Sequence, residues 1–184
     1  MAVGVRYPFG TTEGLNSTNV GTANTTYASV TEYGDNVYHK TKLTLTGALP
    51  AIAGGADLAV GRLLYTFPAG VIRIISAYFD GVAITQSEGN ITADTPDVGL
   101  GTTIASGAVA VLSGTAAFEN VLTGQTFDDC DGTGELAGAA STLIIDAADD
   151  HTMYLNAADG WAASGDAAAT ISGDVIVTWE FIGS

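Results

Sequence analysis

Short alternating runs of apolar and polar residues, without sustained helical periods, dominate the chain after its first 36 residues. The clearest run spans residues 171–181, where Ile, Gly, Val, Val, Trp and Phe occupy every second position. A period of two places alternate side chains on opposite faces of a strand, so this run predicts a half-buried β-strand. Ile176 is the one large apolar residue on its polar side.

Weaker patterns predict further strands, and Gly or β-branched residues interrupt every candidate helix. Asp80-Gly81 separates two β-rich runs and predicts a tight hairpin. A second strand pair is expected around the sequence Ala-Ala-Asp-Asp-His, and residues 116–122 suit a strand or a short helical turn. The other expected strands are 37–46, 62–67, 71–79, 82–86, 98–104, 108–112, 143–146 and 152–155. Eight or so short strands with Gly-rich turns predict an all-β, single-domain jelly roll or β-sandwich.

Residues 1–35 differ from the rest because they are rich in Gly, Thr and Asn and show no hydrophobic period. We therefore predict an extended N-terminal arm at 1–35 and a β-sandwich or jelly-roll body at 36–184. Such an arm needs a surface on which to become ordered. Its own domain and a partner or sister subunit are equally good hypotheses for that surface.

The charges are divided unequally along the chain, which carries a formal net charge of −15. All five basic residues lie at or before Arg73, whereas residues 93–184 contain fourteen acidic residues and no basic one. Binding to nucleic acid requires clustered Lys and Arg, so nucleic acid is not expected as a partner. An anionic membrane surface is disfavoured for the same reason.

The low content of charged residues, 14%, implies a surface made largely of Thr, Ser, Asn, Gly and Ala. Such a surface suits packing against other protein copies, although a stable secreted β-domain also explains it. No basic segment followed by a long apolar run begins the sequence, so synthesis in a cytoplasm is expected. No apolar run is long enough for a membrane-spanning helix. Cys130 is the only cysteine, so no disulfide can form within the chain.

Two acidic segments are candidates for metal binding. From Asp129 onward, residues 129–134 place carboxylates, a hydroxyl and a Gly in the order that opens a calcium loop. Ala140 stands where the bidentate Glu is needed, so a solvated acidic turn at 128–135 is the preferred interpretation. The second cluster contains Asp146, Asp149, Asp150 and His151, which a polar loop between strands also explains. We assign no metal ligand and no cofactor.

No motif for catalysis is present. His39 and His151 are the only histidines, and His39 is expected to be structural. The nucleophile elbow, the metalloprotease helix motif and the phosphate-binding loop are all missing. We therefore predict a non-enzymatic protein without catalytic residues. Four aromatic residues could form a sugar-binding face, although core packing explains them better: Tyr78, Phe79, Trp161 and Trp179.

Several segments between residues 70 and 184 resemble virion structural proteins of tailed bacteriophages, in particular capsid decoration (cement) proteins. The likeness is carried by PDVGLGT at 96–102, ASGAVAVL at 105–112, FENVLTGQT at 118–126, NAADGW at 156–161 and DVIVTWEF at 174–181. The resemblance implies a β-sandwich or jelly roll that assembles as a homotrimer on the outer surface of an icosahedral capsid. It implies the major capsid protein as partner and no catalytic residues.

The function predicted from the sequence is a virion component that decorates a phage capsid and stabilises it by linking capsomers. The alternative is a carbohydrate- or receptor-binding module of a phage tail or adhesin, which an exposed Trp161 would favour. A calcium-dependent enzyme or adhesin centred on residues 128–135 is a third hypothesis.

Overall fold

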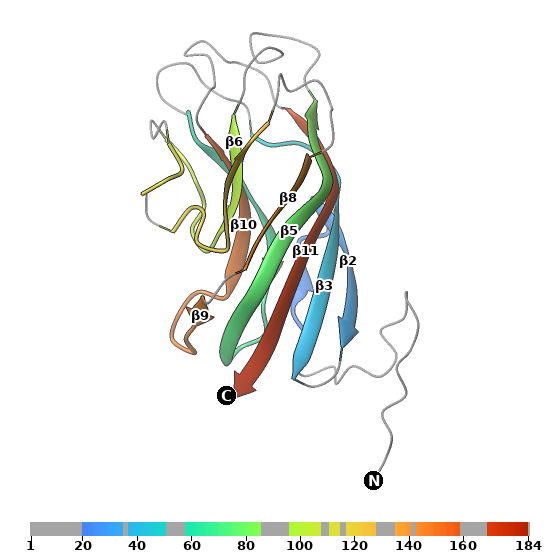
Figure 1. Ribbon diagram of the computed structural model, residues 1–184, viewed down its shortest axis with the longest axis vertical. Coiled ribbons are helices and arrows are strands. Elements are labelled where there is room, and N and C mark those ends of the chain that lie inside the picture. The colour runs from blue at the N-terminus through green and yellow to red at the C-terminus, as the bar shows by residue number, and fades with distance from the viewer. Residues whose placement is uncertain are drawn as a thin grey trace.

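The structure, a computed structural model, is a sandwich of two antiparallel β-sheets (Figure 1). It describes residues 20–34, 37–50, 58–85, 96–107, 111–114, 117–127, 135–140, 143–158 and 169–183. No helix occurs in these residues. The predicted all-β sandwich is therefore confirmed.

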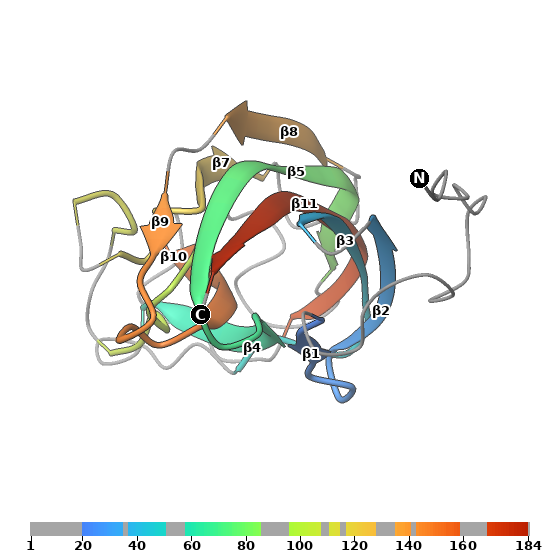
Figure 2. The same ribbon diagram turned by 90° about the horizontal axis from the view of Figure 1, so that it is seen from below.

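In the described residues the two sheets contain eleven strands. The five-stranded sheet has the order β1-β4-β10-β6-β7, and the six-stranded sheet has the order β2-β3-β11-β5-β8, with β9 also pairing with β5. In Figure 2, β8, β5, β11, β3 and β2 form one curved layer, with β1, β4 and β10 opposite. The strands are β1 (Thr22–Ala23), β2 (Ala28–Gly34), β3 (Tyr38–Leu45), β4 (Val60–Thr66), β5 (Val71–Thr85), β6 (Asp97–Gly101), β7 (Leu122–Thr126), β8 (Glu135–Ala140), β9 (Ile144–Ile145), β10 (Thr152–Ala158) and β11 (Thr170–Gly183).

The strand pairs are nested along the chain. β6 pairs with β7, β5 with β8, β4 with β10, and β3 with β11, all antiparallel. Successive pairs belong alternately to the five-stranded and the six-stranded sheet, so the paired strands enclose one core. This nested order is that of a jelly roll, one of the two all-β arrangements predicted from the sequence.

The core fills the space between the sheets. Trp179 and Val177 on β11, Phe79 on β5 and Leu43 on β3 belong to the same buried cluster as Leu155 of the opposite sheet, and all five are fully buried. The alternation predicted over residues 171–181 is confirmed, since β11 covers all of it. Burial of these side chains is the main stabilising contribution, because each contributes roughly 1.5–3 kcal/mol relative to exposure.

The hairpin predicted at Asp80-Gly81 is wrong. β5 continues through both residues, and its register shifts there against both β8 and β11. Gly81 has a φ of +64°, and Gly173 on β11, at the same irregularity, has a φ of +99°. Glycine at positive φ inserts a bulge that bends and twists a strand without reversing it. The Asp80-Gly81 pair therefore lies at a bend within the fifteen-residue strand β5 and not at a turn between two strands.

The strand pair predicted at 143–146 and 152–155 is also wrong, because β9 and β10 belong to different sheets. β9 pairs with β5, and β10 lies between β4 and β6. The strand predicted at 108–112 is not found in its described residues 111–112, and a strand begins only at Leu122 in the region 116–122.

The N-terminal arm predicted at 1–35 is described only from residue 20. From there it forms part of the body: β1 pairs with β4, and β2 pairs with β3 over seven residues. The amide of Gly21 also donates a hydrogen bond to the Tyr65 hydroxyl. For residues 20–34, the chain's own domain is the surface on which they are ordered; residues 1–19 lie outside the described part.

Candidate docking surface

The outer face of the six-stranded sheet is built by strand alternation. On β3, His39, Thr41, Leu43 and Leu45 are buried, so the intervening residues point away from the core. The strand register then aligns outward side chains in rows across β2, β3, β11 and β5. One row is Thr31, Lys42, Ile176 and Tyr78; the next is Tyr33, Lys40, Thr178 and Ser76; a third is Ser29, Thr44, Asp174 and Asp80.

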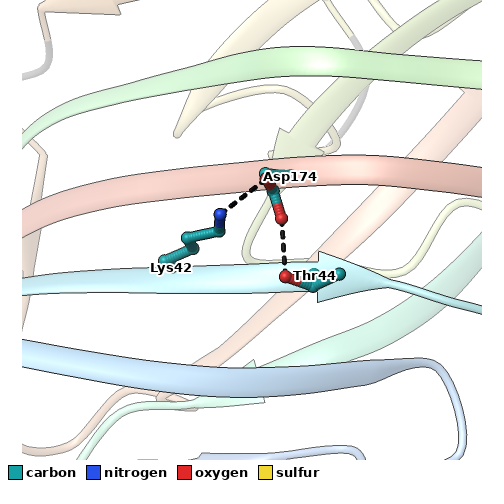
Figure 3. Close-up of polar contacts among 3 residues, drawn as sticks. All are labelled: Lys42, Thr44 and Asp174. Atoms are coloured by element: carbon teal, nitrogen blue, oxygen red, sulfur yellow. Dashed lines mark hydrogen bonds and ion pairs between the residues drawn. The ribbon is translucent and has the colours of Figure 1, made fainter. Parts of the chain in front are cut away.

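Asp174 is the centre of a polar contact between β3 and β11 (Figure 3). The Thr44 hydroxyl donates a hydrogen bond of 2.6 Å to Asp174 Oδ1, and Lys42 Nζ lies 2.7 Å from Oδ2. The hydrogen bond to Asp174 raises the pKa of the Lys42 ammonium. The Lys42 side chain is 36% exposed, so water screens the pair and it adds little to stability. Its main effect is to neutralise two charges on this face.

A second ion pair joins β5 and β11. Arg73 Nη2 lies 2.5 Å from Glu180 Oε1, and the Arg73 side chain is 48% exposed. Together the two pairs make the face nearly neutral. Across β2, β3, β11 and β5 it carries three basic residues (Lys40, Lys42 and Arg73) and three acidic ones (Asp80, Asp174 and Glu180), whereas the other positions of the chain contain two basic and seventeen acidic residues.

Exposed apolar side chains gather at one end of this face. Tyr38 is 56%, Ile144 55%, Ile182 54% and Val37 46% exposed. Tyr38 and Glu180 are register partners, as are Glu180 and Arg73, and Arg73 and Ile144. Tyr38 and Ile144 therefore lie on either side of the Arg73–Glu180 ion pair, and we call the four exposed apolar residues at this end of the sheet the end patch.

The outer face of the five-stranded sheet is different, because the β6–β7 connection packs on it. Asn156 on β10 is fully buried and holds this connection with three hydrogen bonds. Its Oδ1 accepts from the Ala105 amide at 2.8 Å, and its Nδ2 donates to the carbonyls of Thr103 and Phe118 at 2.9 and 2.8 Å. A small apolar cluster lies beneath: Ala59, Ala105, Leu112, Phe118 and Ala158.

The first acidic candidate, 128–135, lies outside the described residues except for Glu135, as do Cys130 and Trp161. In the second acidic cluster, residues 146–151, the Asp149 side chain accepts a hydrogen bond from the Asp146 amide and so stabilises a turn. His151 Nε2 donates to the carbonyl of Gly70 at 2.6 Å. Within the described part of the chain, no three His, Cys, Asp or Glu side chains are grouped as metal ligands.

A pocket of about 270 Å³ lies beside this turn. Its lining includes Thr102, Asn120, Ile144, Asp149 and Asp150, and none of the described residues that line it is aromatic. Of the four aromatic residues considered for a sugar-binding face, Phe79 and Trp179 are core residues, as expected. Trp161 is not among the described residues, and of the other three only Tyr78 lies on the outer face, where it is half-buried.

Sequence reasoning missed a polar network inside the core. Glu32 on β2 accepts hydrogen bonds from the hydroxyls of Tyr65 and Thr41, and Thr41 Oγ1 accepts one from Trp179 Nε1 at 2.8 Å. His39 stacks on Trp179 with ring centroids 3.9 Å apart, which gives it the structural role expected. Burial raises the pKa of Glu32, and burial together with Glu32 raises that of Tyr65. The one sequence signal for this network is the alternation of β2, which places Glu32 on the side of the strand that faces the core.

Comparisons with known proteins leave the family open. No family model and no curated protein matches the chain. One solved structure, an arabinose-bound α-L-arabinofuranosidase, is similar with a TM-score of 0.30 and 11% identity. The match covers 88% of this chain and 23% of that enzyme. No helix in the described residues is long and apolar enough to cross a membrane.

Proposed function

We propose that this chain is a non-enzymatic virion structural protein that decorates an icosahedral bacteriophage capsid and stabilises it by linking capsomers. It binds the major capsid protein on the outer surface of the shell, as a homotrimer. The observation that carries this proposal is the outer face of the six-stranded sheet, which is nearly neutral in a chain of net charge −15.

Charge explains why this face suits a docking role. A strongly acidic surface stays solvated and resists close contact with other acidic surfaces. The outer face instead offers paired charges, hydroxyl groups and three tyrosines (Tyr33, Tyr38 and Tyr78). Tyrosine and Arg are enriched in protein interfaces, whereas Asp, Glu and Lys are depleted there. The fourteen acidic residues after residue 92 then keep the decorated particle soluble.

Decoration also explains how weak contacts suffice. A capsid presents the same site many times, and a protein that holds two or more neighbouring capsomers gains affinity from effective concentration. No single contact needs to be strong. Of the segments that carry the resemblance to decoration proteins, DVIVTWEF at 174–181 lies in β11, in the middle of this face.

Capsids assembled from the major capsid protein of the same genome provide the test. The purified chain is expected to co-sediment with them, and image reconstruction should place it on the outside of the shell. Thr178→Glu adds a charge to the middle of the outer face and should lower the affinity about tenfold or more. Thr152→Glu makes the same change on the opposite sheet and should leave the affinity unchanged. A wild-type chain that does not bind overturns the proposed function. Equal binding by both variants overturns the choice of surface.

A further inference from the structure

Residues 20–34, which we call the edge segment, close one side of the sandwich (Figure 2). The segment contains β1, the end strand of the five-stranded sheet, and β2, the end strand of the six-stranded sheet. β1 pairs with β4 over two residues and β2 pairs with β3 over seven. Three side chains of the segment are buried, and two of them are the small residues Ala23 and Ala28. An edge segment that buries so little apolar surface needs little free energy to open locally.

Glu32 is the third buried side chain of the edge segment, and it joins the segment to both sheets. Its carboxyl group accepts hydrogen bonds from the Thr41 hydroxyl on β3 at 2.8 Å and from the Tyr65 hydroxyl on β4. The Tyr65 oxygen also accepts a hydrogen bond from the Gly21 amide at 2.9 Å. The same phenol therefore holds residues near both ends of the edge segment.

The basic side chains of the neighbouring strands are directed away from Glu32. Lys40 and Lys42 lie at outward positions of β3, and the charged residues of β11 belong to the outer face as well. Arg62 on β4 lies over the ring of Tyr27, 4.5 Å from its centroid. No ion pair with Glu32 is present in the described residues. A negative charge on Glu32 is therefore buried without a positive partner.

Two other titratable groups face the same part of the core. Burial and the neighbouring Glu32 raise the pKa of Tyr65, so its hydroxyl keeps its proton. His39 is two residues from Thr41 and is buried on the same side of β3, where it stacks on Trp179. Burial raises the pKa of Glu32, and its two hydrogen bonds offset part of that shift. Ionisation is therefore easier for Glu32 in water than in the closed structure.

We propose that the edge segment is a pH-dependent latch: it detaches locally when Glu32 gives its proton to water, while the remaining strands of both sheets stay paired. The sign follows from proton linkage. The closed form binds the proton more tightly than the open form, so opening is suppressed below 4.5, the ordinary pKa of Glu. As pH rises above that value, the equilibrium constant for opening should increase by up to about tenfold per pH unit.

Opening would also change the outer face of the six-stranded sheet. β2 supplies Ser29, Thr31 and Tyr33 to the rows of outward side chains on that face. A detached β2 removes these residues and uncovers the backbone edge of β3, to which an extended segment can pair. The latch itself does not depend on the proposed capsid function.

Thiol labelling of the full chain tests the latch. In a Cys130→Ser background, which removes the one native thiol, Ala28→Cys places a thiol at a buried position of β2. Ala77→Cys is the matched control, because Ala77 is fully buried on β5, in the interior of the same sheet. Each labelling rate with dithiodipyridine is divided by the rate of a short cysteine peptide at the same pH, which corrects for ionisation of the thiol. Thermal unfolding establishes that each variant is folded; Ala23→Cys on β1 and Ala157→Cys on β10 replace any that is not.

Three results are expected. The thiol of Ala28→Cys should react about tenfold or more faster than that of Ala77→Cys, because local opening requires less free energy than global unfolding. Its corrected rate should rise as pH increases above 4.5, by up to about tenfold per pH unit. Adding Glu32→Gln should remove this rise, because the amide has no proton to lose in this range.

Each contrary result overturns the latch. Equal corrected rates for the two thiols would show that the edge segment opens only when the whole body unfolds. A rate independent of pH, or a rise that persists with Glu32→Gln, would show that ionisation of Glu32 does not control the opening. A rate that falls as pH rises would assign the control to proton uptake by His39, since a buried neutral histidine that gains a proton on opening has the opposite sign.

Discussion

The carboxyl group of Glu32 on β2 accepts a hydrogen bond from the hydroxyl of Tyr65 on β4, so a polar contact links the two sheets through the core. Thr41 donates to the same carboxyl group at 2.8 Å. Glu32 is only 3% exposed, and no basic side chain is paired with it in the described residues. Burial favours the protonated form of Glu32 and raises its pKa, and the two hydrogen bonds that the carboxyl group accepts offset only part of this shift.

Glu32→Gln should change how stability depends on pH. The folded state raises the pKa of Glu32 through burial. A raised pKa gives stability that is complete below the unfolded pKa and is lost as pH rises through the folded pKa. Gln cannot ionise, so the free energy of unfolding of the variant should rise relative to that of the wild type as pH increases above 4.5, the ordinary pKa of Glu. Urea denaturation across this range measures the difference, and Asp150→Asn, on an exposed turn, controls for general charge effects. A difference that stays constant with pH would contradict the prediction.

Thr41→Val tests the hydroxyl that connects Glu32 to Trp179. Valine has nearly the same shape, but it leaves the Trp179 indole N–H and one Glu32 oxygen without this partner in the core. Each such group costs about 1–3 kcal/mol. Thr44→Val is the control, since Thr44 is exposed on the same strand and also loses a hydrogen bond. It should change stability by about 0.5 kcal/mol or less. Equal effects in urea denaturation would show that the buried network adds no stability.

The sequence predicted those features that depend on local alternation. Residues 171–181 read as a strand because six alternate positions are apolar, and the structure buries Ile171, Val175, Val177 and Trp179 among them. The all-β sandwich followed from the same kind of pattern. In contrast, β9 and β10 are close in sequence but lie in different sheets, because their partners β5 and β4 come from distant parts of the chain. Such pairing is decided by the whole core, which a local pattern does not contain.

The outer face could be predicted only in part. The alternation of β3 and β11 places Lys42 and Asp174 on polar positions, but their meeting depends on the register between two strands that are 130 residues apart. Likewise, the end patch brings together side chains from three separate regions of the sequence. Asn156 gave no sequence signal, because a single polar residue near the end of a strand reads as solvent-facing until a loop is known to cover it.

Asn156→Ala should release the β6–β7 connection from the five-stranded sheet. The substitution removes three hydrogen bonds and leaves the Ala105 amide and the carbonyls of Thr103 and Phe118 without this partner. The loss should be about 2–4 kcal/mol, and hydrogen exchange should accelerate at residues 102–121 more than in β11. Asn120→Ala is the control, because among the described residues its side chain bonds to Thr102 alone, at an exposed site. Uniform acceleration across the body would mean that Asn156 supports the whole core and not this connection.

Gly173→Ala and Gly81→Ala distinguish two requirements at the bend between β5 and β11. Both glycines have positive φ, but a Cβ at Gly173 would lie 2.3 Å from the carbonyl oxygen of Gly81, whereas a Cβ at Gly81 meets nothing within 4 Å. Backbone cannot move aside without breaking the strand pairing. Gly81→Ala should therefore cost only the strain of its conformation, about 1–2 kcal/mol. Gly173→Ala should cost more, because steric overlap adds to strain of about 1–3 kcal/mol. Urea denaturation of both variants measures the order. If Gly81→Ala were the more damaging change, the bend would depend on the conformation of β5 and not on its close approach to β11.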